Sequence, residues 1–403
     1  MSLGRLFFVN RFYWPDEPAT AQLLTDLTRG LAAKGWKVVV VTSRPKRDGV
    51  PAREVREEVT IERVWTTRLG QRSLIGRALD FVSFYAGAGL ALLRSVRRGD
   101  AIVALTDPPL IGVLAGWIAA WRGARLFHWV QDIYPEIAVE VTGYRAPLVL
   151  RPLRNRAWRR ALASVVPGTD MARALRDAGV VADRIAVQPN WAPALLAPAA
   201  DAVLAALRRE WQLEGKFVLA YSGNLGRVHD LEPILDVAAA LRDEPDYVVA
   251  FIGGGAQRAR IEAEVRARGL NNVHFFPAQP RERLAASLGV GDVHFVTLRP
   301  GADRWVFPSK LYGIAAIGRP ALFIGARDCE LAQIVRARGL GASFTRDEAP
   351  AAAAQVRGWR NHPAEREAIG TAARAFAGEG AGLAVQAWHN LLTAKLAERG
   401  ATG

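Results

Sequence analysis

The stretch RLFFVNRFYWPDEPATAQLLTDLTRGLAAKGWKVVVVTS, residues 5–43, decides the fold of the first half of the chain. It opens with a short apolar run, residues 5–9, and continues into a loop rich in proline, aromatic and acidic residues. Four leucines then recur at helical spacing before Gly35, and residues 37–43 have the composition of a second buried strand. This strand–loop–helix–strand order is typical of the start of a parallel α/β sheet.

The same pattern continues along the first half. Further strands are predicted at residues 101–105 and 125–130 and from residue 164 onward, and the first two run into the polar loops TDPP and QDIYPE. In open α/β sheets, ligands bind at the carboxyl ends of the strands. We therefore expect functional side chains in these loops.

A proline-rich segment at residues 188–200, in QPNWAPALLAPAAD, interrupts the pattern and is interpreted as an interdomain linker. A second α/β series follows, with predicted strands at residues 216–223, 247–255, 272–277, 292–298 and 320–325. The length of 403 residues also favours two domains. The prediction is an α/β protein of two doubly wound domains, residues 1–190 and 191–375, followed by an amphipathic C-terminal helix within 376–403.

The composition limits the classes of function. The net charge is +14, and residues 1–190 carry +11 of it, from 28 Lys and Arg against 17 Asp and Glu. Nucleic acid, an anionic membrane surface and phosphorylated substrates are all compatible with this charge. The absence of a recognised nucleic-acid motif disfavours the first. The single cysteine, Cys329, excludes a disulfide framework and suits a reducing cytosol.

No secretory signal is visible at the start of the sequence. The two most apolar stretches, residues 81–93 and 110–121, are shorter than a bilayer-spanning helix. We expect both to be buried helices.

Several common chemistries lack their motifs. The loop after the first strand has no glycine, and the second strand ends without the acid that binds a dinucleotide ribose. Neither a P-loop nor an Asp-x-Asp metal motif is present, and four of the histidines (His128, His229, His274 and His294) are scattered without metal-ligand spacing. A dehydrogenase, a P-loop nucleotide triphosphatase and a metal-dependent sugar transferase are therefore disfavoured.

The second half contains two candidate anion-binding loops. In SGNLGRVHD, residues 222–230, glycines allow close approach of the backbone to an anion, and Arg227 adds a positive charge. In PSK, residues 308–310, free N–H groups, a hydroxyl and the Lys310 ammonium form a second candidate cradle. Two such loops at strand ends of one domain suggest a diphosphate, with the glycine turn 253–255 as weaker support. The alternatives are an ordinary turn with a solvated arginine and a surface lysine.

These segments resemble the group 1 glycosyltransferases, family 4, of the two-domain GT-B fold, in which two Rossmann-like domains face each other across a cleft. Within them, the chain is similar to the bacterial surface-polysaccharide branch of colanic-acid and O-antigen transferases. The resemblance covers nearly the whole length, through segments in family order that include VQDIYPE, PNWAP, YSGNLGRVHDLEPIL, FIGGGAQ and PSKLYGIAAIGRP. It implies retaining, metal-independent transfer from a nucleotide diphosphate sugar, usually UDP-linked, with neither metal nor cofactor.

The resemblance also implies a division of labour, with the donor on the second domain and the acceptor on the first. The C-terminal helix of this fold packs back on the first domain, and domain closure would exclude water. The predicted donor-binding residues are Gly223, Asn224, Arg227, Gly254, Pro277, Ser309, Lys310, Leu311 and Glu330.

The chain departs from the family at two glutamates that normally lie near the sugar and the ribose. Their positions are Trp305 and Gly313 here. Asp303 and Glu330 are candidate replacements, and the alternative for each is a solvated loop acid or a helix cap.

The histidine that the family carries in the first domain falls near Gln131, and a neutral amide cannot transfer its proton. Asp132, Glu136 and Glu17 are the candidate bases for the acceptor hydroxyl. A structural turn acid is the alternative for Asp132. In a retaining transfer, the departing phosphate is itself a candidate proton acceptor, which makes a base unnecessary.

Residues 145–163 hold six arginines among leucines and a tryptophan, and residues 63–98 add more arginines and aromatics. Such a face can lie on anionic lipid; the alternative is a solvated basic face. The hypothesis is a protein attached peripherally to the cytoplasmic side of the plasma membrane, with a lipid-linked acceptor such as a polyprenyl diphosphate sugar. A nucleotide-sugar-binding protein without activity, and a sugar-nucleotide epimerase of the same fold, remain as alternative functions.

Overall fold

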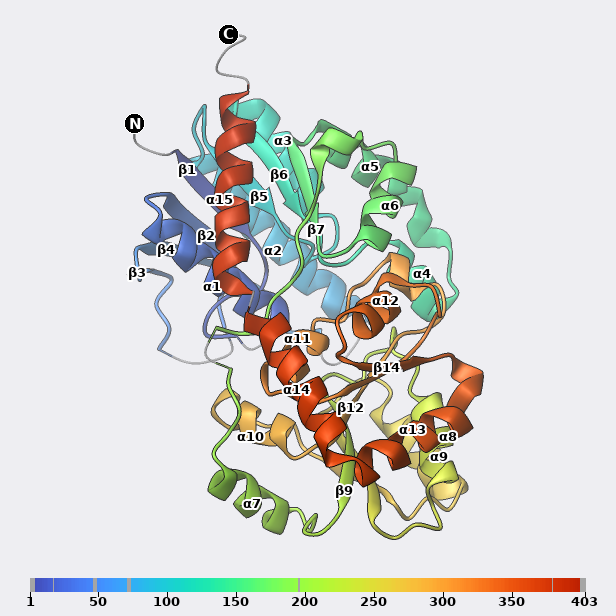
Figure 1. Cartoon of the computed structure of the whole chain (residues 1–403). Coiled ribbons are helices and arrows are strands. Elements are labelled where there is room, and N and C mark those ends of the chain that lie inside the picture. The colour runs from blue at the N-terminus through green and yellow to red at the C-terminus, as the bar shows by residue number, and fades with distance from the viewer. Residues whose placement is uncertain are drawn as a thin grey trace. The chain divides into compact units, whose positions relative to one another are not determined.

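The computed structural model describes residues 4–16, 18–45, 49–70, 74–194, 196–378 and 380–398. The chain forms two compact units (Figure 1). Unit 1 comprises Met1–Asn190, Arg304–Val306 and Ala381–Gly403, and unit 2 comprises Trp191–Asp303 and Phe307–Gly380. The first boundary falls in the proline-rich segment that the sequence singled out as a linker, whereas the short segment Arg304–Val306 was not anticipated as part of the first unit.

Unit 1 is built on one eight-stranded sheet in the order β3-β4-β2-β1-β5-β6-β7-β8, in which only the β3–β4 pair is antiparallel. The strands are β1 (Arg5–Val9), β2 (Lys37–Ser43), β3 (Arg53–Arg56), β4 (Val59–Val64), β5 (Ala101–Ala104), β6 (Arg125–Trp129), β7 (Ala163–Val166) and β8 (Ile185–Val187). The strand order reverses between β1 and β5, so the crossovers from these neighbours depart in opposite directions.

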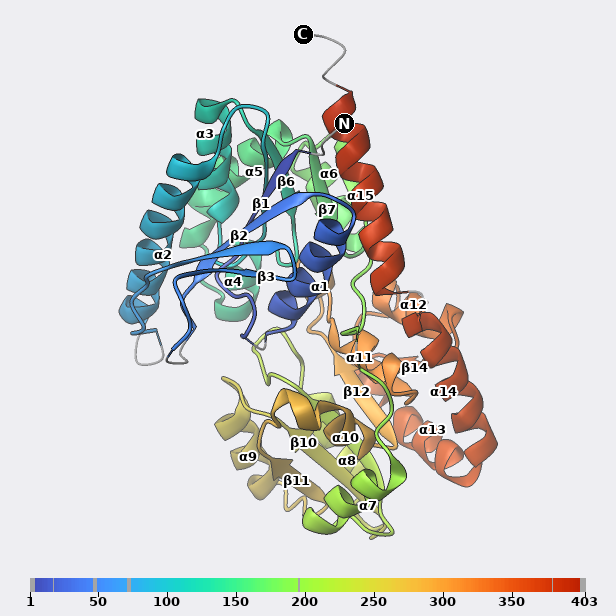
Figure 2. The same ribbon diagram turned by 90° about the vertical axis from the view of Figure 1, so that its left-hand side faces the viewer.

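Helices cover both faces of this sheet. They are α1 (Ala19–Ala33), α2 (Leu74–Ser95), α3 (Ile111–Arg122), α4 (Glu136–Thr142), α5 (Arg151–Arg160), α6 (Thr169–Asp177) and α15 (Ala381–Ala397). Figure 2 shows α2 and α3 on one side of the sheet and α1 and α15 on the other. Doubly wound architecture is therefore confirmed for the first unit.

The C-terminal helix α15 belongs to unit 1 because its buried face packs there. Trp388 meets Trp129 of β6 edge-on, with ring centroids 5.2 Å apart. The indole Nε1 of Trp36 donates a hydrogen bond of 3.1 Å to Nδ1 of His389. The return of the last helix to the first domain, which the family resemblance implied, is seen in these contacts.

Unit 2 contains a six-stranded parallel sheet in the order β11-β10-β9-β12-β13-β14. The strands are β9 (Phe217–Ser222), β10 (Tyr247–Ile252), β11 (Val273–Phe276), β12 (Val293–Thr297), β13 (Ala321–Ile324) and β14 (Gly341–Phe344). In order of appearance this is 3-2-1-4-5-6, the doubly wound arrangement of dinucleotide-binding folds. Its strand order reverses between β9 and β12.

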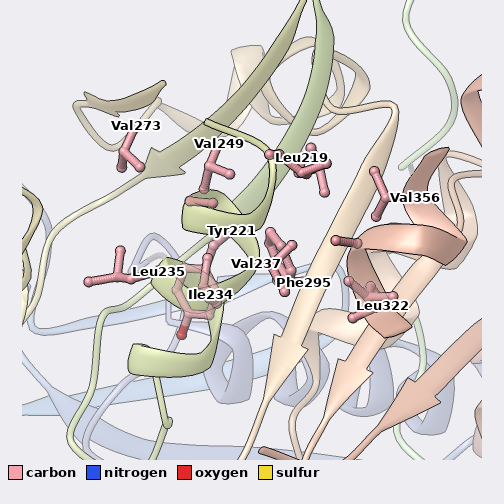
Figure 3. Close-up of a cluster of buried hydrophobic side chains, with 14 of the residues drawn as sticks. Leu219, Tyr221, Ile234, Leu235, Val237, Val249, Val273, Phe295, Leu322 and Val356 are labelled. Carbon is pink, nitrogen blue, oxygen red and sulfur yellow. The ribbon is translucent and has the colours of Figure 1, made fainter. Parts of the chain in front are cut away.

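The helices of unit 2 are α7 (Asp201–Glu210), α8 (Glu232–Ala240), α9 (Arg258–Ala267), α10 (Leu284–Gly289), α11 (Lys310–Ala316), α12 (Glu330–Ala337), α13 (Ala349–Asn361) and α14 (Pro363–Gly378). Figure 3 shows the main core, in which strand residues such as Leu219, Phe295 and Leu322 meet Ile234 of α8 and Val356 of α13. β-Branched and aromatic residues fill the strands because both sheet faces are covered.

Two expectations were incomplete. The strands β3, β4, β8 and β14 were not predicted: β3, β8 and β14 are edge strands without a strong apolar run, and β4 alternates buried and half-buried residues. The stretch 81–93, expected to be wholly buried, lies in the 22-residue helix α2, which has one buried and one exposed apolar face. Phe84, Ala88 and Leu92 enter the core, whereas Ile75 is 75 % and Val82 62 % exposed.

Candidate functional site

The loop after β9 in unit 2 lies at the reversal of the strand order and is tied to the neighbouring glycine turn. The backbone N–H of Gly223 donates to the carbonyl of Ile252 at 2.9 Å, and that of Leu225 donates to the carbonyl of Gly254 at 2.8 Å. Gly253 has a φ of +135°, and a Cβ there would lie 2.2 Å from the carbonyl oxygen of Gly223. Only glycine allows this close approach of two loops.

Gln257 holds the same loop through side-chain hydrogen bonds, and the sequence analysis did not identify it as a site residue. Its buried side-chain Nε2 donates to the carbonyls of Gly226 at 2.7 Å and His229 at 2.9 Å. This amide fixes the path of residues 223–229. The sequence signal was its place directly after the glycine turn.

Lys310, the first residue of α11, carries the strongest electrostatic feature of unit 2. Its ammonium nitrogen is buried without a hydrogen-bond partner and lies 3.6 Å from the centroid of the Tyr221 ring. Burial lowers the pKa of Lys310 to about 7. A buried cation with only an aromatic face beside it is costly, and an anion would relieve that cost.

His229 lies close to this lysine and stays neutral. Its Nδ1 lies 2.7 Å from the carbonyl oxygen of Thr297, and a carbonyl only accepts, so Nδ1 carries the proton. Burial and the nearby Lys310 lower the pKa of His229 to about 3. The hydroxyl of Tyr221 donates to the carbonyl of Asn224 at 3.1 Å. The loop after β9 is thereby tied to the end of β12 and to the end of β9 itself, beside Lys310.

The other predicted donor residues have varied surroundings. The Arg227 side chain and Pro277 are exposed, and Ser309 is the N-cap of α11 without a side-chain cap bond. Leu311 is 1 % exposed, so its side chain belongs to the core and only its backbone is accessible for binding. Glu330 begins α12 after β13 and is half-buried.

The two positions that depart from the family have different surroundings. The carbonyl of Trp305 accepts a hydrogen bond of 2.8 Å from the backbone N–H of Ile133, within unit 1. A Cβ on Gly313 would lie 3.6 Å from Leu196 and 3.7 Å from Leu288. Position 313 thus faces apolar side chains, where an ionised acid would be unfavourable. Asp303 accepts a bond of 3.2 Å from the N–H of Gly301 and so has a turn-stabilising contact.

Unit 1 contains a cavity of about 620 Å³ at the carboxyl ends of its strands. Its lining comes from the loops after β1, β2, β4, β5 and β6, together with the start of α2. The strand order reverses here too, between β1 and β5. This is the position at which ligands bind in open α/β sheets.

Four aspartates line this cavity: Asp16, Asp80, Asp107 after β5 and Asp132 after β6. Burial and the negative charge of Asp107 raise the pKa of Asp132 to about 7. Arg11 Nε forms an ion pair of 3.0 Å with Asp107. Burial raises the pKa of Asp107, and the positive charge of Arg11 opposes that rise. Asp132 is left as the carboxyl group poised to exchange a proton near neutral pH.

Basic side chains surround the mouth of the cavity. Arg44, Arg68 and Arg77 line it with exposed side chains. Asp80 of α2 organises the adjoining loop, since its carboxylate accepts bonds from the backbone N–H groups of Leu69 and Gly70, each at 2.9 Å. The cavity therefore combines acidic groups with exposed cations at its mouth. Asp107 was not singled out in the sequence, although it lies in the TDPP loop that was.

Glu136, a second predicted base, is not part of this arrangement. The buried carboxylate of Glu136 is held by Arg154 through both oxygens and by Arg151 at 2.8 Å, which favours a structural role over the predicted catalytic one. Gln131 exchanges two hydrogen bonds of 2.9 Å with Asn190. Glu17 lies outside the described residues.

Among the residues that the structure describes, no group of three His, Cys, Asp or Glu side chains is placed to hold a metal ion.

Two domain families match the chain. Residues 20–191 match the Glycosyl transferase 4-like domain, and residues 205–376 match the Glycosyl transferases group 1 domain. The chain is 29 % identical over 340 residues to the putative colanic acid biosynthesis glycosyl transferase WcaI of Escherichia coli (strain K12), covering 80 % of this chain and 83 % of that protein. It is 26 % identical over 349 residues to the probable glycosyltransferase WbjE of Pseudomonas aeruginosa, covering 84 % and 85 %.

Solved structures share the fold. The Anabaena protein Alr3699/HepE in complex with UDP-glucose superposes with a TM-score of 0.73 at 16 % identity, covering 97 % of this chain and 99 % of that one. Sucrose-phosphate synthase from Thermosynechococcus elongatus superposes with a TM-score of 0.70 at 19 % identity, covering 97 % of both chains. The expected GT-B fold class is confirmed by these similarities.

The substitution Lys310→Met tests the buried ammonium. Folding lowers the Lys310 pKa from 10.5 to about 7, so wild-type stability should rise with pH between these values as the unfolded state retains the proton. The variant should lack this rise and be more stable at pH 7, by about 2 kcal/mol or more. Urea unfolding measured from pH 6 to 10 checks this. Arg227→Met, at an exposed cation, is the control and should leave stability unchanged; a loss of stability in Lys310→Met would contradict the assignment.

The substitution Asp132→Asn tests the proposed proton acceptor. Since the base must be ionised, turnover in the wild type should rise with pH through about 7, and the variant should lose about a hundredfold or more. Asp107→Asn removes the neighbouring negative charge, lowers the Asp132 pKa and should move this limb of the pH–rate profile to lower pH. Asp183→Asn, at an exposed aspartate of the same unit, should shift nothing. An unmoved limb in Asp107→Asn would refute the coupling.

Proposed function

Because the chain belongs to the group 1 glycosyltransferases, we propose that it moves a sugar, with retention of configuration, from a nucleotide diphosphate sugar to a lipid-linked or saccharide acceptor in bacterial polysaccharide biosynthesis. UDP is the proposed carrier, and no resident metal or cofactor takes part. The polysaccharide context is supported by the relative named for colanic acid biosynthesis. The choice of UDP is supported by the similar fold solved with UDP-glucose.

The observation that carries the donor site is the unpaired ammonium of Lys310, buried beside the glycine loops of unit 2. A diphosphate would give this cation its missing partner and keep it charged at neutral pH. Arg227, on the exposed loop after β9, would approach the same group. The free backbone N–H groups near Ser309 add dipoles of the same sign.

Departure of a nucleotide diphosphate requires stabilisation of the charge that develops on it. Cations and backbone dipoles supply this without a metal in the arrangement that we propose. Position 313 faces leucines, so the ribose and sugar contacts must come from other groups. Glu330, at the start of α12, is the proposed acid for this task.

The cavity of unit 1 is the proposed acceptor site. Asp132, which lines it, would take the acceptor's hydroxyl proton, with burial and the charge of Asp107 raising its pKa. The exposed Arg44, Arg68 and Arg77 suit the diphosphate of a lipid-linked saccharide. The departing donor phosphate is the alternative proton acceptor, and an Asp132→Asn variant with full turnover would favour it.

The exposed face of α2 supports peripheral attachment to an anionic membrane on the cytoplasmic side. One helix in the described part of the chain, Ile75–Ser95, is long and apolar enough to cross a bilayer by length and composition, and a third of it is buried in unit 1. Its exposed residues Ile75, Leu79, Val82, Ala86 and Leu90 follow one helical stripe. Exposed arginines flank this stripe at positions 77, 94, 97 and 98. Apolar burial combined with cationic attraction is how helices lie on lipid headgroups.

A nucleotide-sugar-binding protein without activity is the second candidate, favoured by the missing acids at Trp305 and Gly313. It predicts nucleotide-sugar binding without release of nucleotide. An epimerase would instead interconvert free nucleotide sugars without acceptor.

The first test is a thermal-shift and turnover screen with UDP, GDP, ADP, TDP and their common sugar conjugates, with and without EDTA. We expect UDP compounds to raise the melting temperature, EDTA to have no effect, and UDP to be released slowly. Lys310→Met and Arg227→Met should lose the ligand-induced shift. Lys216→Met, at the opposite end of β9, should keep it. If no nucleotide stabilised the wild type, the donor site would be refuted.

Flotation with vesicles tests the membrane contact. The wild type should float with phosphatidylglycerol vesicles at physiological salt, and less with neutral phosphatidylcholine. Leu79→Glu/Val82→Glu should float about tenfold less, since two apolar side chains that would insert into the membrane are replaced by carboxylates, which carry the same negative charge as the lipid. Val203→Glu/Leu383→Glu is the matched control at exposed apolar residues of α7 and α15. Equal flotation of the two double variants would exclude α2 as the contact.

A further inference from the structure

A groove of about 160 Å³ runs between α3 and α5 on unit 1. One face of each helix lines it, because Val113, Trp117 and Ala120 recur at helical spacing on α3, and Leu153, Arg156 and Arg160 do so on α5. Small side chains at its floor, among them Gly116 and Ala157, keep it open.

Charge in this groove has one sign. Four arginines line it, Arg125, Arg156, Arg160 and Arg184, and no carboxylate is among its lining residues. Arg184 donates one bond of 2.8 Å to the carbonyl of Arg159. Elsewhere in the described chain arginines commonly pair with acids, as Arg5 does with Asp100 at 2.6 Å. Four clustered cations without acids form a receptor for an anionic group.

The groove also offers apolar surface at its rim. Trp117, which lines the groove, is 61 % exposed. Trp121, one turn further along α3 and outside the lining, is 73 % exposed. Exposed tryptophans beside arginines are typical of the interface between membrane and water. Helix α3 packs against both α5 and α2, so it separates the groove from the helix that carries the apolar stripe.

The groove is separate from the proposed reaction site. Arg125 begins β6, whereas Asp132 follows the end of that strand. Arg125 therefore lies at the amino end of the strand and Asp132 beyond its carboxyl end. A ligand in the groove would anchor the protein without occupying the acceptor cavity.

We propose that this groove binds one anionic phospholipid of the membrane, with its phosphate on Arg156 and Arg160 and the first part of an acyl chain against Trp117 and Ala120. The inference rests on the membrane contact proposed above and adds a defined lipid-binding site to it. Both parts of the ligand have a counterpart in the groove: guanidinium groups for the phosphate, and an apolar wall for the chain.

Isothermal titration with monomeric dihexanoyl phosphatidylglycerol tests the site apart from any vesicle surface. The wild type should bind it saturably, one lipid per chain, and dihexanoyl phosphatidylcholine at least about tenfold more weakly. Inorganic phosphate at equal concentration should not displace it. Arg156→Glu/Arg160→Glu should weaken binding about tenfold or more. Ala120→Trp, which fills the groove at an exposed position and keeps its charge, should weaken it about fivefold or more.

Arg209→Glu/Arg338→Glu reverses two exposed arginines of unit 2 and should bind lipid as the wild type does. Unchanged UDP-induced stabilisation in all variants would show that they fold and would separate this site from the donor site. Binding that survives both groove variants would overturn the proposal. Equal binding of phosphatidylcholine, or displacement by inorganic phosphate, would also overturn the assignment to an anionic lipid. Binding of the soluble lipid by a protein that fails to float would leave the groove standing and refute only the α2 contact.

Discussion

Parallel pairing of the strands is the constraint on which both units depend. A parallel sheet needs a crossover helix after each strand, and where the strand order reverses the two neighbouring crossovers leave in opposite directions. That point lies between β1 and β5 in unit 1 and between β9 and β12 in unit 2. Asp107 lies after β5 in the first unit, and Lys310 lies after β12 in the second. The topology leaves room at these places, and the candidate functional residues lie there.

Each unit places an unfavourably buried charge at that point. In unit 2 burial disfavours the ammonium of Lys310, and in unit 1 burial and Asp107 disfavour the carboxylate of Asp132. Both groups have a pKa of about 7, one lowered and one raised. Structural charges such as Glu136 are instead satisfied by close guanidinium partners. The contrast between satisfied and unsatisfied charges distinguishes scaffold from candidate site.

Of the two departures from the family motif, packing accounts for the one at Gly313. Gly313 sits on a helix against two leucines, and Trp305 offers its backbone carbonyl to Ile133. Neither position needs a carboxylate for folding. The loop after β9, beside Lys310, by contrast depends on glycines whose backbones pack directly against each other. It also depends on the side-chain amide of Gln257. The candidate phosphate-binding loops are thus fixed by close backbone packing, whereas positions 305 and 313 carry no such constraint.

The sequence by itself determined the α/β class, the two-domain division near residue 190, most strands and the candidate anion-binding loops, because buried parallel strands and glycine turns are local patterns. It also pointed to Asp132 and Lys310. Only the tertiary structure joined Asp107 and Arg11 to Asp132, assigned Glu136 to arginine pairs, and placed Gln257 under its loop. It alone revealed the exposed stripe of α2 and the arginine groove beside α3. Burial, pairing and the direction of a helix face depend on residues far apart in the chain, so no local pattern specifies them.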